Sequence, residues 1–198
     1  MSKTTAPREL VPREFYARST LEVARELLGL YLVHLDGGVH RAGRIVETEA
    51  YQGPRDLAAH SSKGMTARNA VMFGEPGHAY VYFIYGIWNC VNVVTRESGV
   101  PHAVLIRALE PAGGADGNTW GPGLLCRALH IDRGLNGADL CGDRLWVERR
   151  ASPLPGSSKP RIAAATRIGV DYSGDWAAKP WRFYDKDSPY VSTAKRRR

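Results

Sequence analysis

The fold is decided by a short apolar stretch that contains two carboxylates, Arg44-Ile45-Val46-Glu47-Thr48-Glu49-Ala50-Tyr51. Its β-branched and aromatic residues predict a strand. Residues 30–35 form another apolar run, and the sequence Asp36-Gly37-Gly38 lies between the two runs. Because glycine accepts the positive φ angles of a tight hairpin turn, residues 44–51 are predicted to return antiparallel to residues 30–35. We therefore predict that the fold contains an antiparallel sheet built on these two strands.

The rest of the chain predicts several short strands and few helices. A capping box at Ser19-Thr20-Leu21-Glu22 predicts a helix that ends near Gly29, and Pro122 predicts the start of a second helix over residues 124–131. Strands are predicted within residues 79–95, as a pair joined at Tyr85-Gly86, and at 103–109, 145–148, 162–170 and 181–184. Residues 52–72 and 111–121 are predicted loops, and residues 152–159 a linker. Strands that do not alternate with helices predict an α+β fold in one compact domain over residues 1–198, with flexible tails at 1–8 and 193–198.

Composition limits the class of protein. The chain has 198 residues, of which 43% are hydrophobic and 24% charged, as in ordinary globular proteins. It contains no 18-residue apolar run and no signal-peptide pattern at its start, so we expect neither a membrane span nor secretion. Its three cysteines form no C-x-x-C pair, which argues against a zinc site and favours a reducing, cytoplasmic compartment. The net charge of +7 favours a polyanionic partner such as nucleic acid.

The two carboxylates of the decisive strand, Glu47 and Glu49, have a spacing that suggests chemistry. Side chains two residues apart on a strand share a face, about 6.5 to 7 Å apart. Such a pair can divide acid and base work, because mutual repulsion separates the two pKa values. The pair could instead hold a hard metal ion together with Asp56 or His60, or form a solvated strand end that pairs with arginines. The spacing alone leaves these three interpretations open.

Aromatic residues and one arginine form a second group of candidates. Tyr80, Tyr82, Tyr85 and Trp88 could stack on a flat base, or pack in the core as most aromatic residues in strands do. Tyr85 would lie at a hairpin tip, where a side chain can wedge into a duplex. Arg107, in an otherwise apolar strand, needs an anionic partner if it is buried, and Glu49 is a natural one.

Several segments, in order along the chain, carry the motifs of one family. They are Gly43-Arg44-Ile45-Val46-Glu47-Thr48-Glu49-Ala50-Tyr51, Ala58-Ala59-His60-Ser61, Arg68-Asn69, Met72-Phe73, Tyr80-Val81-Tyr82-Phe83-Ile84-Tyr85-Gly86, Leu105-Ile106-Arg107-Ala108-Leu109-Glu110-Pro111, Gly121-Pro122-Gly123-Leu124-Leu125-Cys126, Arg167-Ile168-Gly169, Trp176 to Tyr184 and Ser188-Pro189. The chain resembles the alkyladenine (3-methyladenine) DNA glycosylases of the mammalian type over about residues 9–192. The resemblance implies a curved, mostly antiparallel, open-barrel-like sheet with a few flanking helices and a protruding β-hairpin.

The resemblance also implies a role for individual residues. Glu49 corresponds to the general base that activates a water for attack on the deoxyribose C1′, and Arg107 corresponds to a residue that helps to hold this water. The remaining matches concern the flipped base. Tyr51 and Tyr82 would stack on either side of this base, and the backbone of His60 would bind its edge. Asn92 would exclude guanine, Ala59 and Ile168 would line the pocket, and Tyr85 would fill the gap left in the duplex. The resemblance assigns no cofactor, no metal and no role to Glu47.

The partner implied is double-stranded DNA that contains damaged purines, and no membrane or obligate protein partner is expected. We expect the protein in the cytoplasm, at the nucleoid, if it is prokaryotic, and in the nucleus if it is eukaryotic. Residues 112–118 look shorter than their counterpart and contain no Lys or Arg, so some phosphate contacts are expected to be absent there. Either DNA affinity is then weaker, or the contacts move to Arg41, Lys63, Arg68 and the basic C-terminal tail. Two alternatives are a damage-binding protein without catalysis, and a metal-dependent nuclease that uses Glu47, Glu49 and Asp56.

Overall fold

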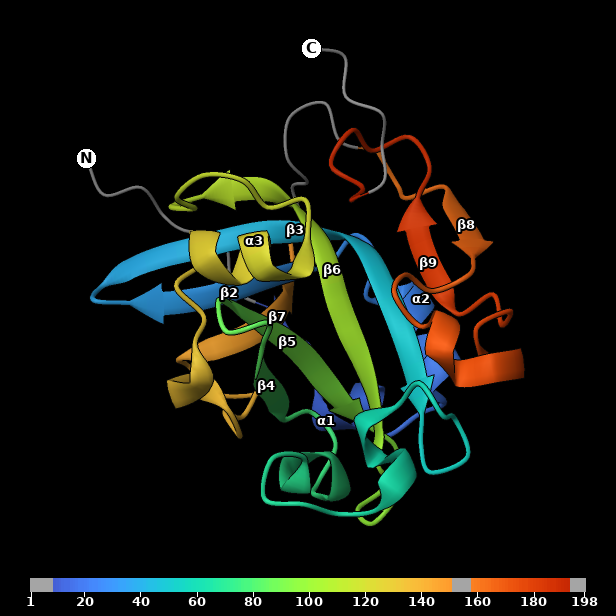
Figure 1. The fold of residues 1–198 in the computed structure, drawn as a ribbon. Helices are drawn as coiled ribbons and strands as arrows, with labels where there is room; N and C mark the ends of the chain where they lie inside the picture. The colour runs from blue at the N-terminus through green and yellow to red at the C-terminus, as the bar shows by residue number, and fades with distance from the viewer. Residues whose placement is uncertain (1–8, 151–157, 193–198) are drawn as a thin grey trace, which may run out of the picture.

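One large sheet organises the computed structural model, which describes residues 9–150 and 158–192 (Figure 1). The strand order is β1-β7-β2-β3-β6-β5-β4, with β9 also pairing to β3, and β8 pairing to β9. All of these pairings are antiparallel. The strands are β1 (Glu9–Leu10), β2 (Tyr31–Asp36), β3 (Val39–Gln52), β4 (Ala79–Ile84), β5 (Trp88–Thr95), β6 (His102–Gly113), β7 (Leu145–Arg149), β8 (Ile162–Ala165) and β9 (Arg182–Asp185).

The long strand β3 is the point at which the sheet divides. Residues 39–44 of β3 pair with β2, and Glu47, Thr48 and Glu49 pair with β9 on one side while β6 continues on the other. The pairing of β3 with β6 shifts register on both sides of Glu47. Such irregularities bend a strand and increase its twist. The two carboxylates thus lie where three strands, β6, β3 and β9, run side by side.

Helices are few and short. They are α1 (Arg13–Tyr16), α2 (Thr20–Glu26) and α3 (Pro122–Ala128), together with the 3₁₀ turns η1 (His60–Lys63), η2 (Ala70–Phe73), η3 (Arg133–Leu135) and η4 (Asp171–Trp176). Helix α2 contacts β3, and the Thr48 hydroxyl donates a hydrogen bond of 2.7 Å to the carbonyl of Ala24. The main core contains fully buried residues of α2 and the residue that follows it, and of strands β3, β6 and β9, among them Val23, Leu27, Ile45, Ile106 and Phe183. In the described part of the chain, no helix is long and apolar enough to cross a membrane.

The α+β fold, the antiparallel sheet and the hairpin that turns at Tyr85-Gly86 are confirmed. Several boundaries were predicted wrongly. Ser19 is the N-cap of α2, as predicted, but its side chain makes no capping hydrogen bond, and α2 ends at Glu26, before Gly29. Strand β6 continues to Gly113, because β3 is long enough to pair with it as far as Ala42. The second helix covers Pro122–Ala128 and not residues 124–131.

The strand predicted over residues 162–170 is also too long. Strand β8 ends at Ala165, whose partner Arg182 is the first residue of β9. With no strand left to pair with, the chain after Ala165 turns away from the sheet edge and enters the site described below. The predicted tails and residues 152–157 of the predicted linker lie outside the described residues.

Candidate active site

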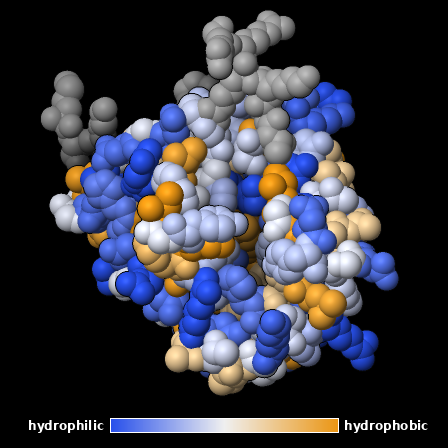
Figure 2. Space-filling model, in the orientation of Figure 1, coloured by the Kyte–Doolittle hydropathy of each residue, from blue (hydrophilic) through white to orange (hydrophobic). Residues whose placement is uncertain are grey.

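A cavity of about 430 Å³ opens beside the middle of the sheet. Figure 2 shows this face of the molecule hollowed near its centre, with hydrophobic residues at the edges of the hollow. The walls come from β3, β4, β5 and β6, from the start of α3, and from two segments near residues 58–60 and 168–172. The structure brings together these residues that were predicted from the sequence: Tyr51, His60, Tyr82, Tyr85, Asn92, Arg107 and Ile168.

The carboxylate of Glu49 lies directly behind this wall and is 0% exposed. Its Oε1 accepts a hydrogen bond of 2.8 Å from the backbone N–H of Ile168. Its Oε2 accepts hydrogen bonds from the Tyr51 hydroxyl (2.8 Å) and from Nη1 of Arg107 (3.3 Å). All three donors belong to residues that line the cavity. A buried carboxylate with three donors is held in one orientation at the base of the pocket.

Charges around Glu49 fix the protonation of its neighbours. Burial, and then the charge of Glu49, raises the pKa of the Tyr51 hydroxyl well above its ordinary value, so this hydroxyl stays protonated and donates a hydrogen bond to Glu49. Burial alone would lower the pKa of Arg107, but the charges of Glu49 and Glu47 outweigh it and the pKa is raised. Arg107 therefore stays cationic beside the carboxylate.

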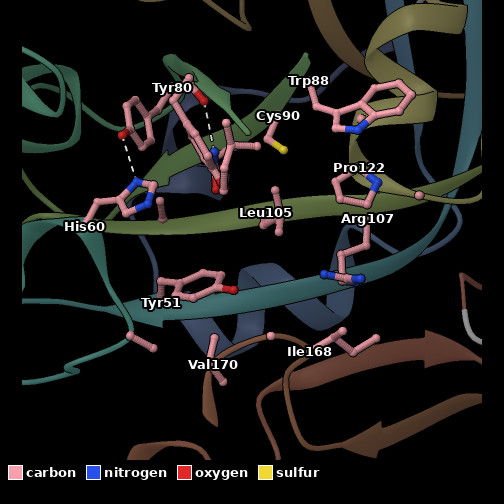
Figure 3. A pocket seen from close by; sticks show the side chains of 18 of the residues that line it. Tyr51, His60, Tyr80, Trp88, Cys90, Leu105, Arg107, Pro122, Ile168 and Val170 are labelled. Carbon is pink, nitrogen blue, oxygen red and sulfur yellow. Dashed lines mark hydrogen bonds between the residues drawn. The ribbon is translucent and has the colours of Figure 1, made fainter. Parts of the chain in front are cut away.

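Aromatic rings cover the opposite side of the cavity (Figure 3). The rings of His60 and Tyr82 lie 4.6 Å apart in an edge-to-face arrangement, and those of Tyr80 and Tyr82 lie 5.3 Å apart. Nδ1 of His60 is 2.9 Å from the Tyr80 hydroxyl. Burial of the ring, and then the nearby charge of Arg68, lowers the pKa of His60, which favours the neutral imidazole. Together with Tyr51 across the cavity, these rings can enclose a flat, apolar or cationic ligand.

Polar and small residues complete the wall. Nδ2 of Asn92 donates a hydrogen bond of 3.0 Å to the carbonyl of Tyr80, so its amide orientation is fixed at the cavity surface. Ala59 is buried just outside the cavity, and its neighbour Ala58 lines it instead. The segment that carries His60 is held by Asn69, whose Nδ2 donates to the carbonyl of His60 at 2.9 Å.

Two exposed tyrosines stand at the mouth of the cavity. Tyr85 is 83% exposed at the tip of the β4–β5 hairpin, where Tyr85 and Gly86 both have positive φ angles, 56° and 70°. Such a pair is typical of a tight hairpin turn, although a tyrosine in this backbone region is uncommon. Tyr172 of η4 is 72% exposed and lines the same mouth. Sequence reasoning missed Tyr172, since nothing in its local sequence sets it apart from a surface residue.

The three basic residues predicted to contact DNA lie in different settings. Lys63 and Arg68 are exposed, and the Arg68 guanidinium lies 5.4 Å from the centre of the Tyr82 ring. Arg41 is bound to two carboxylates, Asp36 at 3.0 Å and Asp116 at 2.6 Å. Arg41 does not line the cavity, and its charge is already neutralised within the protein.

A buried ion pair that the sequence did not reveal supports the pocket from behind. Arg167 and Asp56 are both 0% exposed in their side chains and form a bidentate pair. The Arg167 guanidinium also lies 4.8 Å from the centre of the Tyr51 ring. Arg167 belongs to one of the family segments and Asp56 was considered only as a possible metal ligand, but a pair separated by 111 positions leaves no local signal.

The three carboxylates of the nuclease alternative do not converge. Asp56 is paired with Arg167, Glu47 with Arg182 at 2.9 Å, and Glu49 with Arg107. Within the described residues, no group of three or more His, Cys, Asp or Glu side chains could hold a metal ion.

Known proteins resemble this chain over most of its length. A protein-family model described as "Methylpurine-DNA glycosylase (MPG)" matches residues 14–189. The chain therefore belongs to the methylpurine-DNA glycosylase family, and it is a DNA glycosylase, a hydrolase of N-glycosidic bonds in base excision repair. This confirms the family resemblance drawn from the sequence.

Several relatives, each named "Putative 3-methyladenine DNA glycosylase", match nearly the whole chain. One from Anaeromyxobacter sp. (strain Fw109-5) is 57% identical over 183 residues, which are 92% of each chain. One from Methanocella arvoryzae is 54% identical and covers 92% of this chain and 96% of the relative. One from Legionella pneumophila (strain Corby) is 52% identical, with coverages of 92% and 97%.

Proposed function

We propose that this protein is a monofunctional glycosylase that flips alkylated or deaminated purines out of duplex DNA and hydrolyses their N-glycosidic bond with a water activated by Glu49. The substrates would be of the 3-methyladenine, ethenoadenine and hypoxanthine class. The observation that carries this proposal is the buried Glu49 carboxylate, held by Tyr51, Arg107 and Ile168 at the base of an aromatic pocket. The names of the relatives mention the first of these lesions, 3-methyladenine.

The pocket suits a damaged purine. Aromatic faces attract cationic rings, and an alkylated purine carries positive charge before it leaves. Tyr51 on one side and Tyr82 with His60 on the other would stack on the flipped base, while the amide of Asn92 limits which exocyclic groups fit. A neutral lesion such as hypoxanthine would need a proton as it leaves.

The carboxylate would act in two ways. Cleavage of a purine glycosidic bond passes through a state in which the sugar becomes positively charged, and a nearby carboxylate stabilises that charge. The same carboxylate can take a proton from a water molecule that attacks C1′. Arg107 would hold this water and keep Glu49 oriented. None of the described residues that line the cavity is a lysine, so the wall offers no amine for a Schiff base with the sugar.

Tyr85 would keep the base out of the duplex. An aromatic side chain at the tip of an exposed hairpin can enter the minor groove and occupy the place of the extruded base. Its 83% exposure leaves the ring free to do so.

The test is base release under single-turnover conditions, in EDTA, from duplexes that contain 3-methyladenine, ethenoadenine or hypoxanthine. We expect the wild type to release free base and Glu49→Gln to bind the lesion but lose excision by a factor of about 10² to 10⁴. Glu148→Gln is the matched control. Glu148 is a mostly buried carboxylate that accepts hydrogen bonds from Trp146 and Arg150 and does not line the cavity.

Three outcomes would contradict the proposal. Near-normal excision by Glu49→Gln would remove the general base. Tight lesion binding by the wild type without release of base would favour a damage-binding protein. Strand cleavage that requires magnesium would favour the nuclease.

A further inference from the structure

Glu47 is a buried carboxylate next to Glu49 in the strand that the proposed mechanism leaves without a role. It lies on β3 two residues before Glu49 and is 0% exposed. Burying a charged group is costly unless that group is paired, so its environment must compensate for it.

Three groups from distant parts of the chain contact this carboxylate. Oε1 of Glu47 accepts a hydrogen bond of 2.9 Å from Nη1 of Arg182 on β9, and Oε2 accepts one of 2.7 Å from the backbone N–H of Ser192. Oε1 also lies 3.5 Å from Nε of Arg107. Glu47 thus joins the C-terminal segment to the arginine that contacts Glu49.

The Arg107 guanidinium is shared between two carboxylates. Its Nη1 is 3.3 Å from Glu49, and its Nε, 3.5 Å from Glu47, makes no hydrogen bond with any described residue. A guanidinium paired with a single carboxylate usually forms two parallel hydrogen bonds of about 2.7 to 2.9 Å. Both contacts are longer than that, so neither carboxylate has Arg107 to itself.

We propose that Glu47 is a positioning residue that draws Arg107 away from Glu49 and so preserves Glu49 as a base. This inference rests on the proposed function, in which Glu49 activates the water. Without Glu47, Arg107 would be free to close onto Glu49, occupy its oxygens and stabilise its ionised form. A carboxylate stabilised in this way accepts a proton less readily.

The other charged and titratable groups around Glu49 support the same conclusion. Tyr51 on β3 donates to Glu49, Tyr82 on β4 feels its charge, and Arg182 on β9 is its cross-strand neighbour. Glu47 is the only one of the groups named here that carries a negative charge near Glu49. Removing the charge of Glu47 therefore makes the electrostatic potential at Glu49 more positive.

The experiment measures single-turnover release of 3-methyladenine as a function of pH, with uncatalysed release subtracted. This lesion is already cationic, so the acid limb of the profile reports on the enzyme. In Glu47→Gln, we expect the acid limb to move down by about 1 to 2 pH units, as for a charge about 7 Å away in a medium of effective dielectric near 20. The plateau rate should fall about 10-fold, much less than in Glu49→Gln.

Two variants serve as controls. Glu47→Asp keeps the charge and should restore most of the limb position. Glu110→Gln removes a carboxylate of β6 that pairs with Arg44 at 2.6 Å and does not line the cavity, so it should leave the limb in place. If Glu47→Gln does not fold, Arg182→Gln tests the opposite sign. It removes the positive charge closest to Glu47, and the limb should move to higher pH.

The results separate the two proposals. An unmoved limb in Glu47→Gln or in Arg182→Gln, whether or not the rate falls, overturns the positioning role while the function stands. No release by the wild type, or full activity of Glu49→Gln, overturns the proposed function and the role of Glu47 with it.

Discussion

Arg167 connects three separate segments of the candidate active site, and its replacement gives the sharpest test of how the site is held together. The guanidinium forms its bidentate pair with Asp56, one bond of which is 2.9 Å. It also donates to the backbone carbonyls of Ala50 (3.0 Å) and Trp176 (3.1 Å). The next residue, Ile168, donates its N–H to Glu49. The perturbation is Arg167→Met, which keeps the stem and removes the charge.

The expected cost follows from these contacts. Breaking a buried ion pair by removing one partner costs about 3 to 5 kcal/mol, and the buried carbonyl of Ala50, which loses a donor, costs about 1 to 3 kcal/mol. The carbonyl of Trp176 is only half-buried and still accepts from the N–H of Lys179 at 3.3 Å, so its cost is smaller. One factor lowers the sum: Asp56 keeps two backbone N–H donors, at 3.0 and 3.1 Å. We expect Arg167→Met to lower the free energy of unfolding by about 5 kcal/mol. For a chain of this size that corresponds to a fall in Tm of about 10 to 20 °C.

The assay is urea and thermal unfolding of Arg167→Met, Asp56→Asn and the double variant. Because the double variant leaves no uncompensated charge, it should be less destabilised than the sum of the single variants, by about 3 kcal/mol. The control is Arg18→Met, which breaks an exposed pair with Glu26 and should cost less than about 1 kcal/mol. A cost below about 1 kcal/mol for Arg167→Met, or strict additivity in the double variant, would refute the reasoning.

Three further predictions concern DNA. Tyr85→Ala should leave stability unchanged and slow excision of a stably paired lesion about 10- to 100-fold, because it loses a stacking contact worth about 1 to 3 kcal/mol. The effect on a mispaired lesion should be smaller, and equal effects in single-turnover assays would argue against a role of Tyr85 in holding the base out of the duplex. Raising the salt concentration should weaken lesion-DNA binding steeply, and Lys63→Ala or Arg68→Ala should each reduce the slope of log K against log salt by about 1. Arg41→Ala should leave the slope unchanged, because the guanidinium of Arg41 is already paired within the protein. A flat salt response would exclude phosphate contacts. Because the pKa of His60 is lowered below 6.5, its ring should be neutral at pH 7 and gain a proton only at lower pH, where the added charge would weaken binding of a cationic purine. An NMR titration of the ring, and a pH series of lesion binding by the wild type and His60→Asn, measure this effect. A ring that titrates above 6.5 would contradict the prediction.

Local sequence was enough to predict the parts of the fold that depend on local chemistry. The β-branched runs, the Asp36-Gly37-Gly38 turn and the Tyr85-Gly86 turn predicted the two hairpins, because strand propensity and positive φ angles are properties of neighbouring residues. The same reasoning extended the strand at residues 162–170 too far. Its apolar residues have the pattern of a strand, but β9 begins opposite Ala165 and offers no partner beyond it. Strand ends are set by the partner strand, which the local pattern does not contain.

The candidate site shows the same limit more clearly. Resemblance and residue chemistry selected Glu49 and Arg107, and the structure places them 3.3 Å apart. The Arg167–Asp56 pair escaped notice, although Asp56 had been considered as a metal ligand. An isolated acidic residue in a turn-rich loop has many possible partners, and only the folded chain selects one from 111 positions away.

Glu47 and Glu49 show that a sequence pattern can select candidate carboxylates, whereas only their environment in the folded protein distinguishes their roles. Both are carboxylates of one strand and both are 0% exposed, so spacing and burial treat them alike. Their neighbours differ: Glu49 is bound by three residues that line the cavity, whereas Glu47 is bound by Arg182 and by the backbone of the C-terminal segment. The donors around Glu49 would turn its oxygens toward a substrate, and those around Glu47 turn its charge toward Arg107. The two Gln substitutions should therefore have different effects: Glu49→Gln removes the base, and Glu47→Gln shifts the pH at which the base works.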